Sequence, residues 1–374
     1  MRCCAGANAG RAPDEHPGRH AVSTHPAEFR ALPDLAGRAL GAAVVWSNDD
    51  FFASAHNLIN PGPAGHDPAA FDARGKVYDG WETRRRRDDS DRLAAHPADE
   101  VIVRLAVPGL VRGVLIDTSH FTGNYPPYAS VEAATMLGYP PAGELRTAEW
   151  TSLLARSELA GDTENAFAVF AADRLSSHVR LRIYPDGGVA RLRVHGEPVA
   201  DPRFLGGRLD LAATLHGGRI LGCSNRFYSA PANVLAPGRS AVMSDGWENA
   251  RRRDDGNDWL DVGLAGAGVL HSVVIDTTRF VGNAPGAARL TDLDTGAELL
   301  PRTPLLPDTE HRFKVGSSAP VRRVRLDVYP DGGISRLRVL GELTAEARAE
   351  LGRRWLALLP GELAAGIAAD ELFD

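Results

Sequence analysis

Hydrophobic and polar residues alternate over several short stretches of this chain, with the period of two expected of β-strands that bury one face. In "HVRLRIYPDGGVARLRVHG", residues 178–196, Val179, Leu181 and Ile183 can face a core while the arginines between them face away. The Pro-Asp-Gly-Gly sequence is typical of a tight turn, because proline fixes φ and glycine tolerates positive φ. The pattern therefore predicts a β-hairpin, and it returns from Val324 as "VRLDVYPDGGISRLRVLG".

Four sequence blocks, the last of them the predicted hairpin, occur twice and in the same order. "SNDDFFASAHNL" at 47–58 resembles "CSNRFYSAPANV" at 223–234, and "DGWETRRRR" at 79–87 resembles "DGWENARRR" at 245–253. "IDTSHFTGN" at 116–124 returns as "IDTTRFVGN" at 275–283. Such ordered self-similarity indicates a tandem duplication, and the spacing between matching blocks predicts shorter loops in the second copy.

The expected fold is all-β, with tandem duplicated antiparallel β-sandwich domains, for which a jelly-roll topology is plausible, and a short C-terminal helix. Short runs such as "VIVRLAV" and "GVLIDT" are interpreted as separate strands. The expected domains are a disordered N-terminal tail over 1–27, a first sandwich over 28–200, a second over 201–343 and a helical tail over 344–374. Within that tail Leu351, Trp355, Leu358 and Leu359 share one helical face, which predicts packing on the body or on a neighbouring subunit.

Composition narrows the function classes. The 374 residues contain 42 basic and 48 acidic side chains, a balance that argues against a general binder of nucleic acid or of anionic membranes. No apolar run reaches the ~18–20 residues needed to span a membrane, and the N-terminus has no hydrophobic signal core. The three cysteines form neither a disulfide framework nor a zinc motif, so a cytoplasmic location is expected.

The arginine motif is the strongest chemical signal in the sequence. If 81–87 is extended, Trp81, Thr83, Arg85 and Arg87 share one face, and Glu82, Arg84 and Arg86 share the other. A guanidinium offers a planar fork of donors to a carboxylate, and a glutamate beside arginines can orient them or move a proton. A charged edge strand that deters aggregation, or pairing of the arginines with nearby acids, is the competing interpretation.

The loop "HFTGNYPP" at 120–127 carries His120, Asn124 and Tyr125, which are polar groups of the kind found at loop-borne sites. A structural turn with an incidental histidine explains the loop equally well. In the second copy Arg279 replaces His120 and Ala284 replaces Tyr125, so either this chemistry belongs to the first copy alone or the histidine is incidental.

The stretches "LPDLAGRALGAAVVWSNDDFFASAHNLI", "YDGWETRRRR", "IDTSHFTGNYPP" and "YPDGGVARLRVHGE", with their second copies, resemble the allantoicase (allantoate amidinohydrolase) family from about Leu32 to Glu342. The resemblance implies two β-sandwiches of the galactose-binding, jelly-roll type. It implies hydrolysis of allantoate to ureidoglycolate and urea in purine breakdown. It also implies a homo-oligomer, either a trimer or a hexamer.

Site roles follow from this implied substrate, a small anion with two ureido groups. The hypothesis assigns proton transfer to Glu82, with Glu248 as its counterpart and His120 as a second candidate. The side chains assigned to substrate binding are Arg84, Arg85, Arg86, Arg252, Asn124 and Tyr125. No metal ligands are assigned and no cofactor is required by the sequence, although a divalent metal such as manganese stays open.

Three alternatives remain open. The first is a non-enzymatic β-sandwich module that binds small anions or sugars, and the second is a hydrolase of a related ureido compound. The third is a nucleic-acid binder that acts through Arg84–Arg87. The second copy also departs from the first, because Asn249 and Ala250 stand where Thr83 and Arg84 do. An allantoicase-like protein with altered substrate or lost activity is compatible with those changes.

Overall fold

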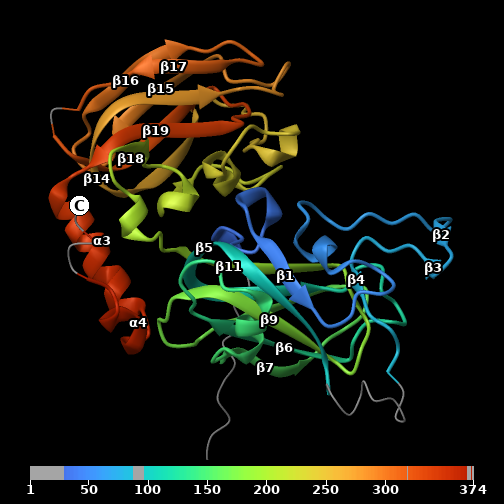
Figure 1. Ribbon diagram of the computed structural model, residues 1–374. Coiled ribbons are helices and arrows are strands. Elements are labelled where there is room, and N and C mark those ends of the chain that lie inside the picture. Colours follow the sequence, from blue (N-terminus) through green and yellow to red (C-terminus); the bar gives the residue numbers. More distant parts are fainter. Residues whose placement is uncertain (1–28, 87–96, 318, 369–371, 373–374) are drawn as a thin grey trace, which may run out of the picture.

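The computed structural model describes residues 29–86, 97–317, 319–368 and 372, which form two β-sandwiches and a C-terminal helical segment (Figure 1). The predicted all-β tandem fold with a C-terminal helix is confirmed. The predicted disordered tail and Arg87 lie outside the described residues, and the domain boundaries at 200 and 343 stay predictions. No described helix is long and apolar enough to cross a membrane.

The strands of the first repeat are β1 (Ala43–Ser47), β5 (Asp99–Asp117), β6 (Tyr128–Ala134), β7 (Thr151–Glu158), β8 (Glu164–Ala168), β9 (Ser176–Tyr184) and β11 (Arg191–Pro198). Short strands β2 (Phe71–Asp72), β3 (Gly75–Lys76), β4 (Trp81–Glu82) and β10 (Gly188–Val189) lie outside its main sheet. Those of the second repeat are β12 (Arg208–Asp210), β13 (Arg219–Cys223), β14 (Asp258–Asp276), β15 (Ala287–Asp292), β16 (Glu298–Pro304), β17 (Glu310–Lys314), β18 (Val321–Tyr329) and β19 (Arg336–Leu343). The α-helices among the described residues are α2 (Ala142–Thr147), α3 (Ala345–Leu358) and α4 (Gly361–Ala365).

The two repeats share one topology. The strand order β1-β5-β9-β6-β7 of the first repeat returns as β13-β14-β18-β15-β16 in the second. In the first repeat β11 and β8 both pair with the second half of the long strand β5. In the second repeat β19 and β17 pair in the same way with the long strand β14. This shared pairing matches the duplication that the sequence blocks predict.

The long strand β5 belongs to both layers of its sandwich. Residues 99–104 pair with β9, and 101–104 also pair with β1. Residues 109–117 pair with β11, 113–117 also pair with β8, and Gly109 retains one pairing with the start of β9. The ladder with β9 shifts register between Arg104 and Gly109, where the strand passes from one layer to the other. The runs "VIVRLAV" and "GVLIDT" are therefore parts of one strand, and the interpretation as separate short strands is wrong.

The predicted hairpin around Pro-Asp-Gly-Gly is also wrong. Strands β9 and β11 do not pair with each other in their described registers, because β9 pairs with the first half of β5 and β11 with the second. The segment 185–190 therefore crosses from one layer to the other, and its residues Gly188–Val189 form β10, which pairs with β4. The second repeat makes the same crossing between β18 and β19.

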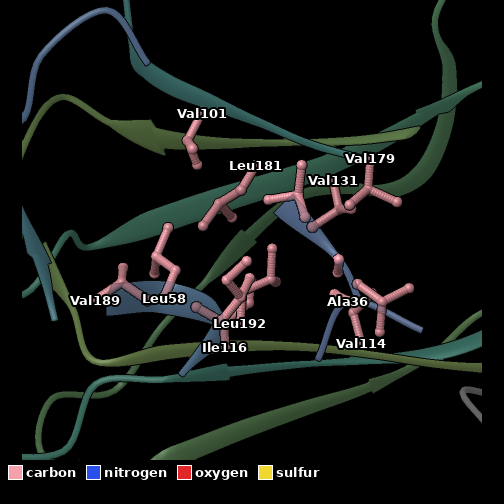
Figure 2. Close-up of a cluster of buried hydrophobic side chains, with 14 of the residues drawn as sticks. Ala36, Leu58, Val101, Val114, Ile116, Val131, Val179, Leu181, Val189 and Leu192 are labelled. Carbon is pink, nitrogen blue, oxygen red and sulfur yellow. The ribbon is translucent and has the colours of Figure 1, made fainter. Parts of the chain in front are cut away.

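The core of the first repeat lies between its two layers (Figure 2). The alternation predicted which side chains enter it, since Val179, Leu181 and Ile183 are fully buried, as are Leu192 and Val194 beyond the crossing. At about 25 cal/mol per Å² of apolar surface, this burial is the main source of stability for each sandwich. A separate core fills the second repeat.

The C-terminal helix packs on the β-sandwiches of its own chain, which is one of the two predicted alternatives. Thr344 caps α3 by accepting a hydrogen bond from the Ala347 amide. Helix α3 leaves the second repeat and runs along the side of the molecule towards the first (Figure 1). There Trp355 is buried against Leu110 and Leu175 of the first repeat. The helix therefore connects the two sandwiches.

Candidate functional site

Glu82 is fixed at one end of the first sandwich by the tryptophan beside it. Trp81 is fully buried, and its indole Nε1 donates a hydrogen bond to the Asp49 carbonyl oxygen at 2.7 Å. Strand β4 pairs Trp81 with Val189 and Glu82 with Gly188, so the crossing segment holds this strand in place. Because successive side chains of a strand point to opposite sides, the burial of Trp81 turns Glu82 away from the core centre.

The Glu82 carboxylate and the Asn124 amide meet, although they are distant in sequence. Asn124 Nδ2 donates a hydrogen bond to Glu82 Oε1 at 2.8 Å. Burial raises the pKa of Glu82 above its usual value, and the hydrogen bond from Asn124 opposes that rise without cancelling it. A carboxyl group with a raised pKa can both release and accept a proton closer to neutral pH.

Arg84, two residues after Glu82 in the chain, is held by a buried aspartate. Its Nε lies 2.8 Å from Asp49 Oδ2, and its guanidinium lies over the Phe51 ring at 5.6 Å. The Asp49 side chain is fully buried, whereas 57% of the Arg84 side chain is exposed. The loop that carries Asp49 also contacts the backbone of Glu82, because the amides of Phe52 and Ala53 point to the Glu82 carbonyl oxygen. A positive charge is thereby anchored to the loop that contacts the backbone of Glu82.

Arg86 and Arg252 occupy equivalent positions with structural contacts. The Arg86 side chain is 1% exposed, and its Nη2 lies 2.7 Å from both the Ala98 carbonyl oxygen and Asp99 Oδ1. Arg252 makes ion pairs with Asp254 at 2.8 Å and with Asp258 at 3.2 Å. These contacts favour a role in tying the motif to the start of β5 or β14.

The alternation of buried and exposed residues in the arginine motif ends at Arg84. Strand β4 ends at Glu82, and residues 83–86 are irregular. Arg85 is exposed although the extended pattern places it with Trp81, and Arg86 is buried although that pattern places it with Glu82. The predicted two-faced arrangement over 81–87 is therefore wrong at Arg85 and Arg86. Hydrogen bonds to Asp49, Asp99 and Asp186, rather than a sheet ladder, fix the chain beyond Thr83.

His120 and Tyr125 both contact neighbouring loops. His120 Nε2 lies 3.2 Å from the Ala64 carbonyl oxygen, and its ring stacks on His66 at 4.6 Å. Its backbone has a φ of 71°, and Arg279 at the equivalent position has a φ of 75°. Because both copies need this left-handed conformation, the position serves the turn in each repeat. Tyr125 is half-buried, with its ring against Gly161.

Sequence reasoning missed the ion pair that anchors the start of the motif. Asp79 Oδ2 lies 2.6 Å from Arg191 Nη2, and the second repeat has the same pair between Asp245 and Arg336 at 3.0 Å. Burial favours a higher pKa for Asp79, but hydrogen bonds from Arg191 and the Gly65 amide outweigh it and lower that pKa. The signal was present, since both partners recur in the repeated blocks "DGWE" and "RLRV".

Asp49 was missed as well, although it stands in the first repeated block. Asn225 takes its place in the second copy, where its carbonyl oxygen accepts the Trp247 indole hydrogen bond at 2.9 Å. Only the first copy therefore has an acid that can hold an arginine at the position of Arg84. Comparing the two copies for charge, rather than for similarity, would have found this pair.

The second repeat retains the carboxylate and its amide. Asn283 Nδ2 donates to Glu248 Oε1 at 2.6 Å, which matches the contact in the first repeat.

Among the described residues, no group of three or more His, Cys, Asp or Glu side chains is arranged to hold a metal ion. Two pockets lie elsewhere, one beside Arg112 and Thr151 and the other between the repeats beside Val199 and Leu351.

Comparisons with known proteins identify a family for this architecture. A model described as the allantoicase repeat matches residues 33–199 and 209–344. A probable allantoicase of Nocardia farcinica is 52% identical over 325 residues, covering 85% of this chain and 96% of the relative. A probable allantoicase of Streptomyces coelicolor is 46% identical, covering 87% of this chain and 89% of the relative. The crystal structure of allantoicase from Saccharomyces cerevisiae superposes with a TM-score of 0.71 at 32% identity, covering 84% of this chain and 96% of that one.

Proposed function

Because this chain belongs to the allantoicase family of amidinohydrolases, we propose that it hydrolyses allantoate to ureidoglycolate and urea and that the first repeat carries the reaction. The observation that supports this assignment is the Glu82–Asn124 pair together with the anchored Arg84, two residues from Glu82 in the chain. It combines a proton-transfer group, an amide that can bind a planar ureido group, and a cation for a carboxylate.

The proposed reaction breaks the bond between the central carbon of allantoate and one ureido nitrogen. Arg84 binds the substrate carboxylate, and Asn124 positions Glu82 and offers its amide oxygen to a ureido N–H. Glu82 in its protonated form protonates the departing nitrogen, which leaves as urea. The resulting carboxylate then takes a proton from the water that supplies the new hydroxyl group, so the glutamate is restored to its initial state.

The other predicted residues have different support. The contacts of Arg86 and Arg252 favour structural roles, so we do not assign them to the substrate. The substrate roles of Arg85 and Tyr125 and the catalytic role of His120 stay predictions. A catalytic role for Glu248 would need a second reaction centre, which this proposal does not include. A homo-oligomer, either a trimer or a hexamer, also stays a prediction that light scattering coupled to size-exclusion chromatography would test.

The direct test is to incubate the purified full chain with allantoate and to follow urea and ureidoglycolate by NMR. The proposal expects both products in equal amounts. Binding of allantoate without urea release would indicate a non-enzymatic module instead. Faster urea release from ureidoglycolate than from allantoate would indicate a hydrolase of a related ureido compound.

Arg84→Ala is expected to raise the KM for allantoate by about 10- to 100-fold, since a hydrogen bond to a charged group contributes roughly 1.5–3 kcal/mol. Arg84→Lys should recover part of the loss, because lysine keeps the charge without the planar fork. Steady-state kinetics measures both variants. The control is Arg302→Ala, which removes another exposed arginine that lies over an aromatic ring, 4.1 Å from Tyr329 in the second repeat. A KM for Arg84→Ala equal to that of this control would exclude the proposed contact.

Asn124→Ala is expected to move the pH profile of kcat/KM to higher pH. The Asn124 N–H stabilises the ionised form of Glu82 and so lowers its pKa, and burial alone then raises that pKa further in the variant. The part of the pH profile that is governed by the pKa of Glu82, here called the Glu82 limb, must therefore move to higher pH. This holds whether the active enzyme needs Glu82 ionised or protonated. Asn257→Ala, which removes an amide bonded to Asp327 in the second repeat, is the control. An unshifted limb, or one displaced to lower pH, would contradict the role of Asn124.

A further inference from the structure

The two repeats hold the same carboxylate–amide pair in the same frame. Glu82 and Glu248 each follow a fully buried tryptophan, and each accepts a hydrogen bond from an asparagine amide, at 2.8 Å and 2.6 Å respectively. The anchoring is also equivalent, because Trp247 bridges to Ile334 as Trp81 pairs with Val189. A polar pair kept in both copies of a duplicated fold can therefore bind the same chemical group in both places.

The ion pair of Arg84 and Asp49 has no counterpart at the equivalent positions of the second repeat. In the first repeat Arg84 and the buried Asp49 form an ion pair at 2.8 Å, and in the second Ala250 and Asn225 occupy those positions. Both partners have become uncharged, and the Ala250 amide still donates to Asn225 Oδ1 at 3.2 Å, so the local backbone contact persists. The cation proposed to bind a substrate carboxylate is thus replaced by a methyl group in the second repeat.

Exposed apolar side chains border the second pair, as Phe51, the counterpart of Phe227, does in the first repeat, where it is 45% exposed. Phe227 and Tyr228 are 69% and 62% exposed, and they lie on the loop whose backbone contacts Glu248. Met243 is 44% exposed, and its Sδ lies 3.7 Å from Asn283 Nδ2. Such a rim without a counterpart of Arg84 favours a small ligand without net charge, because an anion there would lose hydration without gaining the cation that the first repeat supplies at this position.

We propose that Glu248, Asn283 and the rim residues Phe227, Tyr228 and Met243 form a second ligand site that takes an uncharged ureido compound, such as urea or a monosubstituted urea. The Glu248 carboxylate accepts N–H groups of the ligand, and the Asn283 amide contacts its planar ureido group. The site binds this ligand without hydrolysing it. The choice of ligand class rests on the proposed function, because that function has the same carboxylate–amide pair recognise a ureido group in the first repeat. A ligand of this size is expected to bind weakly, with a Kd of the order of 1 mM.

The first test uses N-methylurea as the probe, with the full chain and saturation-transfer NMR on the methyl signal. Because the first repeat can also bind a ureido group, the measurements are made in an Asn124→Ala background. The proposal expects a saturation-transfer signal in this background that is lost when Glu248→Ala and Asn283→Ala are added. A signal that persists in the triple variant would overturn the proposal, as would a background protein that gives none.

A gain-of-function variant tests the same idea without removing any contact. Asn225→Asp together with Ala250→Arg recreates the ion pair of the first repeat in the second. In a Glu82→Gln background, which is expected to bind allantoate without turning it over, the amount of allantoate bound at saturation should double when the two changes are added. Unchanged binding would overturn the proposal. So would a background protein that already binds allantoate in both repeats.

These results are separable from the proposed function. If the unaltered chain releases no urea from allantoate while N-methylurea binding depends on Glu248 and Asn283, the second site stands and the proposed reaction fails. If urea is released while N-methylurea binding is indifferent to those two side chains, the reaction stands and the second site fails.

Discussion

Replacing Glu82 by glutamine is expected to abolish turnover of allantoate while the protein stays folded. General acid–base catalysis by a positioned side chain contributes about 10²–10⁴-fold, so kcat should fall by about that factor or below detection. Glutamine has nearly the same shape and can still accept the Asn124 hydrogen bond, but its amide cannot exchange a proton in this pH range. The loss should therefore appear in kcat rather than in binding.

The measurement is urea release at saturating allantoate, with circular dichroism and thermal unfolding as evidence of an intact fold. Glu298→Gln is the matched control, because it makes the same chemical change at an exposed position of the second repeat. If the Glu82 variant kept a kcat close to that of this control, Glu82 would not be the proton-transfer group. Its raised pKa would then reflect burial alone.

The duplication and the core could be predicted because both depend on information that is local in the sequence. The repeated blocks gave the tandem sandwiches, and period-two alternation placed Val179, Leu181 and Ile183 in the core correctly. Each of these inferences needs only the order of residues within one short segment. The family resemblance, which rests on the same blocks, is confirmed by the match over both repeats.

The strand partners could not be predicted in the same way. The alternation around Pro-Asp-Gly-Gly is the same whether β9 and β11 pair with each other or with separate halves of β5. A local pattern reports which side of a strand is buried, but not which strand lies next to it. The crossing between layers depends on the whole length of β5, which the sequence interpretation had divided into two.

The sequence predicts some residues of the candidate site but not their contacts. Glu82 and Asn124 were both chosen, for separate reasons, and their hydrogen bond follows only from the packing of two distant loops. The arginines were treated as one group because they are adjacent, although Asp49 holds Arg84 near the surface and Asp99 draws Arg86 into the interior. The position of an acid partner in the fold therefore decides the role of each arginine, and adjacency in the sequence does not.

Trp355→Ala is expected to destabilise the chain by roughly 3–5 kcal/mol, the range for removing a large buried aromatic side chain. Trp355 is 1% exposed and packs against Leu110, Leu175 and Val199 of the first repeat, although its helix begins at the end of the second. Because the helix carries this contact from one sandwich to the other, the alanine variant should also unfold the two repeats less cooperatively.

Guanidinium unfolding followed by tryptophan fluorescence and circular dichroism measures both effects. Trp355→Phe should cost much less than Trp355→Ala, because it keeps most of the apolar contact and removes a buried indole N–H for which the described residues provide no acceptor. Arg353→Ala, an exposed position on the same helix, is the control for changes in helix propensity. If the alanine variant unfolded with the midpoint and slope of this control, the helix would cover the first repeat without stabilising it, and the two sandwiches would have to be coupled through the segment between them.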